Sequence, residues 1–235
     1  MKPTSPKNTV RLCAAIAALL AAATASAAPL LNFQFNEGTG VQTTDAINSV
    51  VGRFGIHQNP LVDTVTLMDA SPSGLPGDRC FTNSGSGFLL VDDAVSPVLN
   101  ITNGPITIET WIYVDFATVP KTAEGIAGYG SSYKLGMRGG YQVFTLFGIS
   151  DITNTAAGQI PAGQWVHLAA AWEPGVGVHF FVNGIEHLEP HTALAARPVA
   201  NYYLGIGSEG FANSAVAAYD RLRIHNALLT AAELD

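Results

Sequence analysis

The chain has 235 residues, of which 48% are hydrophobic and only 12% are charged, and its formal net charge at pH 7 is −7. An acidic chain repels phosphate backbones, which argues against a nucleic-acid partner. Beyond the N-terminal leader, no stretch of the sequence is long and apolar enough to cross a bilayer as a helix, so we expect no membrane span.

The N-terminus has the pattern of a secretory signal peptide. Lys2, Lys7 and Arg11 precede an alanine-rich apolar run that closes on Ala-Ser-Ala. This order is typical of a signal peptide with a small-x-small cleavage site, and we expect cleavage after Ala27. The mature chain, residues 28–235, then keeps eight cations against 18 acids, a formal charge of −10. We therefore expect a secreted or periplasmic protein with a single domain over residues 28–235.

Short runs of β-branched and aromatic residues alternate with turn signals along the mature chain, beginning with LLNFQFN and ending with AYDRLRIH. This spacing predicts an all-β sandwich. In residues 106–114, every second side chain is aliphatic or Thr, which predicts a core face. Glu109 and Trp111 fall on the opposite face, which is mixed aromatic and polar.

Residues 164–190 contain two Trp and three His, which raises the question of a catalytic cluster. Residues 165–172 are largely apolar on both alternating faces, as in a central strand that is covered on both sides. Asn183-Gly184 predicts a type I′ turn, which would pair Val182 with Ile185. In that register His179 and His187 point to opposite faces, so we expect no zinc site.

We therefore assign the conspicuous side chains of this segment to the core: Trp165, His167, Trp172, Phe180 and Val182. Cys13 leaves with the signal peptide, so Cys80 has no partner for an internal disulfide. We expect Cys80 to be a small buried thiol.

Three stretches resemble a known family. They are ITIETWIYV, GQWVHLAAAWEPGVGVHFFVNGIEHL and YYLGIGSEGFANSAVAAYDRLRIHNALLTAAELD, and FNEGTGVQTTDAINSVVGRFG is a looser match. They are similar to laminin G-like domains of the concanavalin A-like lectin/glucanase superfamily. The resemblance implies an antiparallel jelly-roll sandwich of two sheets. Independently, Thr230 and Glu233 form a T-x-x-E capping box, which predicts a short helical turn at the C-terminus.

The resemblance also implies a structural Ca²⁺ between the N-terminal loop and the last strand. The matching positions are Asp45, Asn48 and Asp220. Loop oxygens are the ligands that this hard cation prefers. The sequence departs from the family pattern at Ile47, Val50 and Arg221, and whether calcium binds stays open.

Glucanases of this fold place two carboxylates on one strand in an E-x-D-x-E pattern, which holds acid and nucleophile close together. Glu109 stands alone in its strand, so we expect no hydrolase activity and no catalytic residues. A sugar site needs an aromatic platform and planar polar groups. The candidate ligand-binding residues lie in or near predicted loops: Tyr129, Tyr133, Arg138, Tyr141 and Asn154.

The sequence therefore predicts an exported, non-catalytic binding module, with a glycan or surface glycoconjugate as the favoured ligand. The alternative is a protein-interaction or envelope-structural domain, and a cryptic glycoside hydrolase ranks below both.

Overall fold

The computed structural model describes residues 27–37, 42–56, 65–68, 70–83, 87–91, 96–115, 124–199, 203–208 and 216–234. Apart from Ala27, the predicted signal peptide lies outside these residues. In the described part of the chain, no helix is long and apolar enough to cross a membrane.

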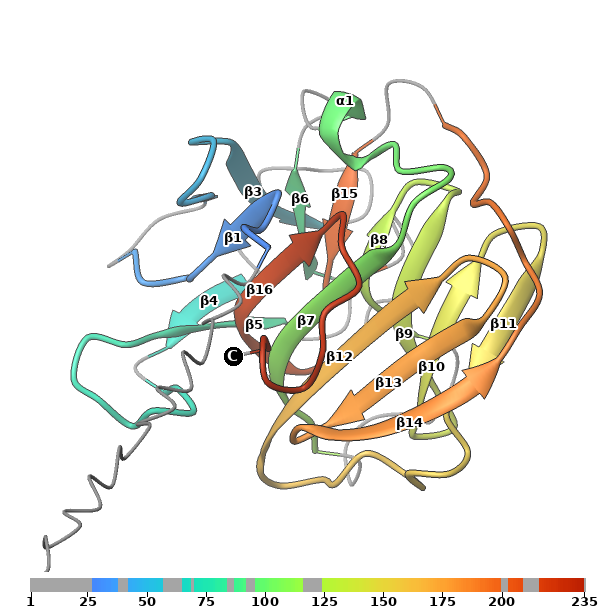
Figure 1. The fold of residues 1–235 in the computed structure, drawn as a ribbon. Coiled ribbons are helices and arrows are strands. Elements are labelled where there is room, and N and C mark those ends of the chain that lie inside the picture. The colour runs from blue at the N-terminus through green and yellow to red at the C-terminus, as the bar shows by residue number, and fades with distance from the viewer. Residues whose placement is uncertain are drawn as a thin grey trace, which may run out of the picture.

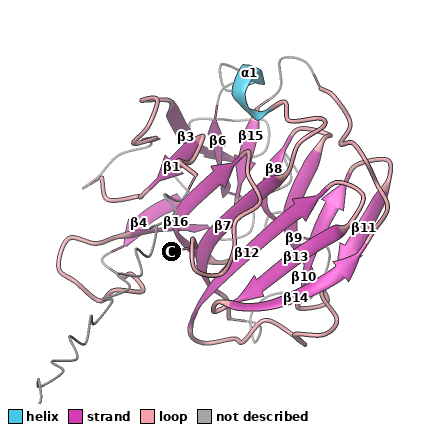
Figure 2. Cartoon of the chain, in the orientation of Figure 1, coloured by secondary structure: helices cyan, strands magenta, loops and turns pink. Residues whose placement is uncertain are grey.

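The described regular structure is almost entirely strand, with one short helix, α1 (Ser96–Leu99) (Figure 2). The first half of the chain forms β1 (Leu31–Phe33), β2 (Gln42–Thr44), β3 (Val51–Ile56), β4 (Val65–Met68), β5 (Cys80–Asn83), β6 (Gly87–Val91) and β7 (Ile106–Tyr113). The second half forms β8 (Glu124–Tyr129), β9 (Tyr133–Arg138), β10 (Tyr141–Leu146), β11 (Ser150–Thr153), β12 (Trp165–Glu173), β13 (Gly177–Val182), β14 (Ile185–Pro190), β15 (Leu204–Ile206) and β16 (Ala218–His225).

These strands form two antiparallel sheets that lie face to face (Figure 1). Sheet A has the order β14-β13-β12-β7-β16-β5-β4, with β1 also paired to β16. Sheet B has the order β11-β10-β9-β8-β15-β6-β3-β2. The predicted two-sheet jelly-roll sandwich is confirmed.

The core lies between the sheets and is built from alternate residues of each strand. From β7 it takes Ile106, Ile108 and Ile112, and from β12 it takes Val166, Leu168, Ala170 and Trp172. Sheet B contributes Leu135 and Phe144 among others. Because side chains alternate across a strand, the residues between these point to the outer faces of the sandwich.

The β13–β14 hairpin has the predicted register. Val182 pairs with Ile185 and His179 with Leu188. Asn183 and Gly184 both have positive φ, 49° and 76°, as a type I′ turn requires. One of the two bonds of the predicted capping box is present: the Glu233 carboxylate accepts the Thr230 N–H at 2.9 Å. The Thr230 hydroxyl also donates to that carboxylate at 2.8 Å, while the Glu233 N–H bonds the Thr230 carbonyl.

The C-terminal segment, residues 226–234, covers part of the outer face of sheet A. Leu228 and Leu234 pack against Ala169, Ala171 and Phe181. The central strand β12 is therefore covered on both faces, as predicted.

Not every side chain assigned to the core lies between the sheets. Trp172 and Phe180 are fully buried there, and Val182 is half-buried against the core. His167 is also buried, but it lies on the outer face of sheet A. Trp165 shares that face and is only half-buried. The period-2 pattern separates the two faces, but it does not show which outer residues are covered.

Candidate functional site

A polar surface lies on the outer face of sheet B where β9, β10 and β11 meet. Leu135 and Phe144 point into the core, so their strand neighbours point outward. We call this surface the β9–β11 face. Arg138 and Asp151 are its exposed residues, Tyr141 and Thr153 are half-buried, and Lys134, Val143 and Thr145 are buried beneath them. Arg138 pairs with Tyr141 across the β9–β10 ladder, and Thr145 pairs with both Lys134 and Asp151.

A salt bridge organises the β9–β11 face. Arg138 Nη2 lies 2.5 Å from Asp151 Oδ2, and the two side chains are 51% and 31% exposed. The hydroxyl of Thr145 donates a 2.7 Å hydrogen bond to the other carboxylate oxygen, Oδ1. The carboxylate is thus held by partners from two neighbouring strands, while the guanidinium keeps half of its surface open.

The electrostatics of this face keep Asp151 ionised. Burial alone would raise the pKa of its carboxyl, but the hydrogen bonds from Thr145 and Arg138 and the charges of Arg138 and Lys134 outweigh it, and the pKa is lowered. Lys134 is buried, and its Nζ lies 5.6 Å from the centre of the Phe147 ring. The face therefore carries two fixed cations and one fixed anion at neutral pH.

Arg138 and Tyr141 are the predicted ligand-binding residues that the structure brings together, because they face each other across the β9–β10 hairpin. Arg138 is exposed and Tyr141 is half-buried. Sequence reasoning missed their neighbours Lys134 and Thr145. The alternation of β9 and β10 would have found both, since each lies an even number of residues along its strand from a predicted site residue.

Tyr129 and Tyr133 lie next to a turn, as expected, but they do not belong to this face, which corrects the expectation that they could bind a ligand. Both are 0% exposed, with ring centroids 5.8 Å apart in the core. The hydroxyl of Tyr133 donates a 2.8 Å hydrogen bond to the carbonyl of Leu99, and that of Tyr129 contacts the carbonyl of Val199 at 3.4 Å. Neither ring has surface available to a sugar.

Asn154 is likewise fully buried and has a structural role. Its side-chain amide donates to Gln142 at 3.3 Å, and its Oδ1 accepts the N–H of Ala157 at 3.2 Å. Gln142 in turn donates a 2.8 Å hydrogen bond to the carbonyl of Ala169 in sheet A. This network joins the two sheets and is closed to an external ligand.

The three predicted calcium ligands have hydrogen-bonding roles within the fold. The carboxylate of Asp45 accepts the backbone N–H groups of Asn32 and Asn48, both at 2.5 Å. The side-chain amide of Asn48 donates to the carbonyl of Leu30 at 2.6 Å. Together these contacts hold the turn after β2 against β1, a task that needs no cation.

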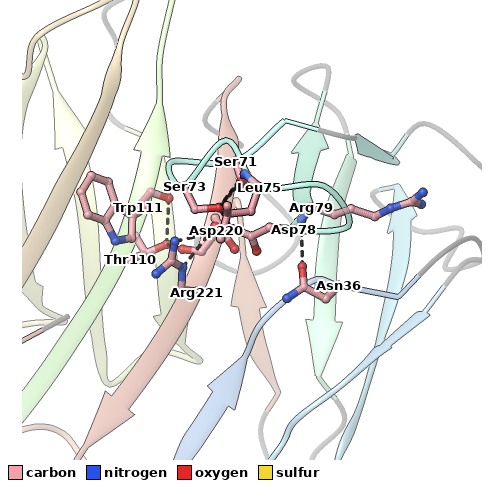
Figure 3. Close-up of polar contacts among 10 residues, drawn as sticks. All are labelled: Asn36, Ser71, Ser73, Leu75, Asp78, Arg79, Thr110, Trp111, Asp220 and Arg221. Atoms are coloured by element: carbon pink, nitrogen blue, oxygen red, sulfur yellow. Dashed lines mark hydrogen bonds and ion pairs between the residues drawn. The ribbon is translucent and has the colours of Figure 1, made fainter.

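Asp220, the third predicted calcium ligand, lies at a β-bulge of β16 and contacts a loop between β4 and β5 (Figure 3). Arg221 follows it with φ of 49° and places its Nε 3.3 Å from Asp220 Oδ2. The same guanidinium lies 3.7 Å from Asp78, whose Oδ2 accepts a 2.5 Å hydrogen bond from Ser73. Asp220 is 0% exposed, and among the described residues its Oδ1 has no hydrogen-bond partner.

Burial raises the pKa of Asp220 to about 6; the nearby charge of Asp78 adds to the rise, and the charge of Arg221 opposes it. The guanidinium of Arg221 lies beside the Asp220 carboxylate, and this neighbouring positive charge disfavours the binding of a metal cation there. No group of three His, Cys, Asp or Glu in the described parts of the chain could hold a metal ion. Calcium binding at Asp45, Asn48 and Asp220 stays a prediction, and the charge of Arg221 beside Asp220 argues against it.

A buried ionic cluster on the outer face of sheet A was missed by sequence reasoning. Glu109 is 0% exposed and contacts His167 at 3.2 Å, Arg223 at 3.0 Å and His225 at 3.1 Å. The ring of Trp111 lies 5.3 Å from that of His167. For His167, this arrangement answers the question of whether the histidines of residues 164–190 form a catalytic cluster. A carboxylate with no exposed surface cannot reach a substrate, so the cluster ties β7, β12 and β16 together.

Residues 85–235 match the family model of the concanavalin A-like lectin/glucanases superfamily, of the laminin G type. Among curated protein sequences, none matches the chain significantly.

Several solved structures share the fold. Domain 4 of AbnA, a GH43 extracellular arabinanase from Geobacillus stearothermophilus, in complex with arabinotriose, is 16% identical with a TM-score of 0.66 over 89% of this chain and 97% of that one. The ligand-binding domain of botulinum neurotoxin serotype D, in complex with N-acetylneuraminic acid, is 13% identical with a TM-score of 0.61, over 87% of this chain and 49% of that one.

The Trypanosoma rangeli sialidase, in complex with sialic acid, is 12% identical with a TM-score of 0.54, over 86% of this chain and 32% of that one. The chain thus spans about half of the toxin domain and about a third of the sialidase. At these identities, the likeness establishes the fold. Because the matched residues 85–235 make up more than half of its length, the chain belongs to the concanavalin A-like lectin/glucanases superfamily.

Proposed function

We propose that the protein is an exported, non-catalytic carbohydrate-binding domain and that the β9–β11 face is its binding surface. The observation that carries this proposal is the arrangement of Arg138, Asp151 and Tyr141 on one outer face. A guanidinium and a carboxylate offer planar donors and acceptors side by side, which suits the neighbouring hydroxyls of a sugar. The ring of Tyr141 can cover the apolar side of a sugar ring.

Preorganisation of this face supports the proposal. Thr145 and Arg138 already fix the carboxylate of Asp151, so a ligand would not have to order it. The solved structures of this fold include domains in complex with arabinotriose and with N-acetylneuraminic acid, which adds support at the level of the fold. The signal-peptide pattern supports export.

A glycan array with the purified mature protein tests this function, followed by calorimetric titration of the strongest ligand. We expect Arg138→Ala and Tyr141→Ala each to weaken binding by about tenfold or more, since each removes an interaction worth about 1.5 kcal/mol. Arg197→Ala is the matched control, because Arg197 is an exposed arginine between β14 and β15, outside this face. Equal affinity of Arg138→Ala and Arg197→Ala would refute the assignment.

The absence of catalysis is tested on the same sample. Incubation with a polysaccharide panel should release no reducing sugar, because the paired carboxylates of glycoside hydrolysis are missing from the strand that would carry them. If the Arg138→Ala variant still released reducing sugar, the protein would be a hydrolase whose catalytic site lies outside the β9–β11 face.

The second candidate function is protein interaction, which one observation favours. Strand β14 is at the edge of sheet A, and it exposes Ile185 by 64% and Leu188 by 45%. An edge strand with exposed apolar side chains is a place where another chain can pair. Light scattering would show self-association, and Leu188→Lys should abolish it if β14 is the contact.

A further inference from the structure

A cavity of about 330 Å³ opens on the outer face of sheet A, beside the buried ionic cluster: its Trp165 lies two residues along β12 from His167. It forms where one row of side chains crosses four strands: Trp165 on β12 pairs with Tyr113 on β7, which pairs with Ala218 on β16, which pairs with Thr82 on β5. Two large rings are thus followed by two small side chains. The step in side-chain size leaves a hollow beside the rings.

The two rings form a corner of this cavity. Their centroids lie 5.9 Å apart at an interplanar angle of 67°, in an edge-to-face arrangement, so their faces point in different directions. Tyr113 is 37% exposed and Trp165 is half-buried, so both rings are accessible. The remaining walls are mostly apolar and come from Ala70, Cys80, Val216, Ala217 and Ala218.

The polar groups around the cavity are few. Asn83 lines it, but its side chain is used within the fold, donating to the carbonyl of Gly207 at 3.1 Å and accepting the N–H of Ala217 at 3.4 Å. Thr82 adds a hydroxyl. Of the described residues that line the cavity, Asp115 alone is charged, and its charge is negative.

We propose that this cavity binds a fully methylated ammonium group, such as the trimethylammonium group of choline. The electron-rich faces of Trp165 and Tyr113 attract a cation, and Asp115 adds an opposite charge at the same site. A primary ammonium would need several hydrogen-bond acceptors, which the apolar walls do not supply. A methylated ammonium has no N–H groups to satisfy, and its methyl groups suit those walls.

A sugar fits this cavity less well than it fits the β9–β11 face. Sugar hydroxyls need several converging planar polar groups, and the amide of Asn83 is already engaged. The acidic mature chain, with a formal charge of −10, also favours a cationic ligand over an anionic one. The inference is independent of the proposed glycan function, since it concerns a different face and a different ligand.

The test is calorimetric titration of the purified mature protein with choline and with 3,3-dimethyl-1-butanol, the uncharged carbon analogue of choline, at matched ionic strength. We expect choline to bind about tenfold more tightly than the analogue, because only choline gains the cation–π and carboxylate attraction. Equal affinities, or no binding of choline, would overturn the proposal.

Two variants locate the binding. Trp165→Leu should reduce choline affinity by about tenfold or more, and Asp115→Asn should reduce it several-fold while leaving the analogue unaffected. Tyr113→Leu replaces Trp165→Leu if the latter changes the thermal melting curve. Arg138→Ala, on the β9–β11 face, should bind choline as the wild type does. Loss of glycan binding with choline binding intact, or the reverse, separates the two proposals.

Discussion

Replacing Asp220 by Asn should stabilise the mature protein at neutral pH. The carboxyl group is fully buried, and its Oδ1 has no hydrogen-bond partner among the described residues. Burial raises its pKa from 3.8 to about 6, and the nearby charge of Asp78 contributes to the rise. Arg221 favours the ionised form, but it offsets only part of the desolvation.

The direction in which pH changes the free energy of unfolding follows from proton linkage. An acid whose pKa is raised by folding holds its proton more tightly in the folded state. The free energy of unfolding is then highest below pH 4, falls between about pH 4 and 6, and is level above that range with respect to this group. A difference of about two pKa units corresponds to about 3 kcal/mol. Asn removes the charge but also a contact with Arg221, so we expect a gain of about 1–3 kcal/mol at pH 7.5 and none at pH 4.

The measurement is urea unfolding of the wild type and of Asp220→Asn at several pH values from 4 to 7.5. Asp78→Asn is the control, and we expect it to change the free energy of unfolding in the opposite direction. Burial alone would raise the pKa of Asp78, but hydrogen bonds from Ser73 and Ser71 and the charge of Arg221 lower it. Its stabilisation is therefore present above the ordinary carboxyl pKa and is lost as the pH falls, so Asp78→Asn should destabilise the protein at pH 7.5.

A destabilised Asp220→Asn variant at pH 7.5 would refute this reasoning. If EDTA also lowered the wild-type melting temperature to that of the variant, the carboxylate would be ionised and bound to a cation. That result would restore the calcium site that the family resemblance implies.

Four further substitutions test the packing of the fold by urea unfolding. Glu109→Gln should cost about 3 kcal/mol, because it leaves the guanidinium of Arg223 without its carboxylate, and a loss below about 1 kcal/mol would mean that the cluster is well solvated. Gly177→Ala should cost more than Gly184→Ala, because a Cβ at Gly177 would lie 2.3 Å from the carbonyl oxygen of Glu189, whereas one at Gly184 has no atom within 4 Å. Gly184→Ala should cost about 1 kcal/mol, because its positive φ is the only source of strain. Equal losses of stability in Gly177→Ala and Gly184→Ala would contradict the steric argument. Thr230→Ala should cost less than about 1 kcal/mol, because it removes only the exposed hydrogen bond from the Thr230 hydroxyl to Glu233, and a larger loss would contradict this assignment.

The hairpin and the central strand were predictable because their signals are local. Asn183-Gly184 selects a turn type, and the turn type fixes the register of every pair behind it. Likewise, β12 is apolar on both alternating faces, and the structure covers both. Such features need no knowledge of where distant segments pack.

The tyrosines at the β8–β9 turn show where local signals mislead. Tyr129 and Tyr133 flank a segment of Gly and Ser, and sequence reasoning placed them in or near a loop, with rings available to a ligand. The turn in fact occupies only the residues between them, and both tyrosines end strands whose alternation points them inward. Their hydroxyls are tolerated there because carbonyls of Leu99 and Val199, distant in sequence, accept their hydrogen bonds.

Glu109 shows a second limit. The strand pattern places it on the outer face of β7, but its partners Arg223 and His225 lie more than a hundred residues further along the chain. Its burial depends on what covers that outer face, which a pattern within one strand does not reveal. The same limit applies to Trp165, whose accessible ring follows from small side chains on the neighbouring strands.

The two outer faces of the sandwich differ in what they leave open, and that difference decides where ligands can bind. On sheet A, Leu228 and Leu234 cover the middle of β12, and Glu109 is enclosed by Arg223 and two histidines. The end of that sheet with Tyr113 and Trp165 is hollow, and its lining is mostly aromatic and apolar. On sheet B, the β9–β11 face keeps a fixed ion pair within reach of solvent. Under the two proposals above, the apolar cavity suits a methylated cation and the ion pair beside Tyr141 suits sugar hydroxyls. Substitutions on one face should therefore leave binding at the other unchanged.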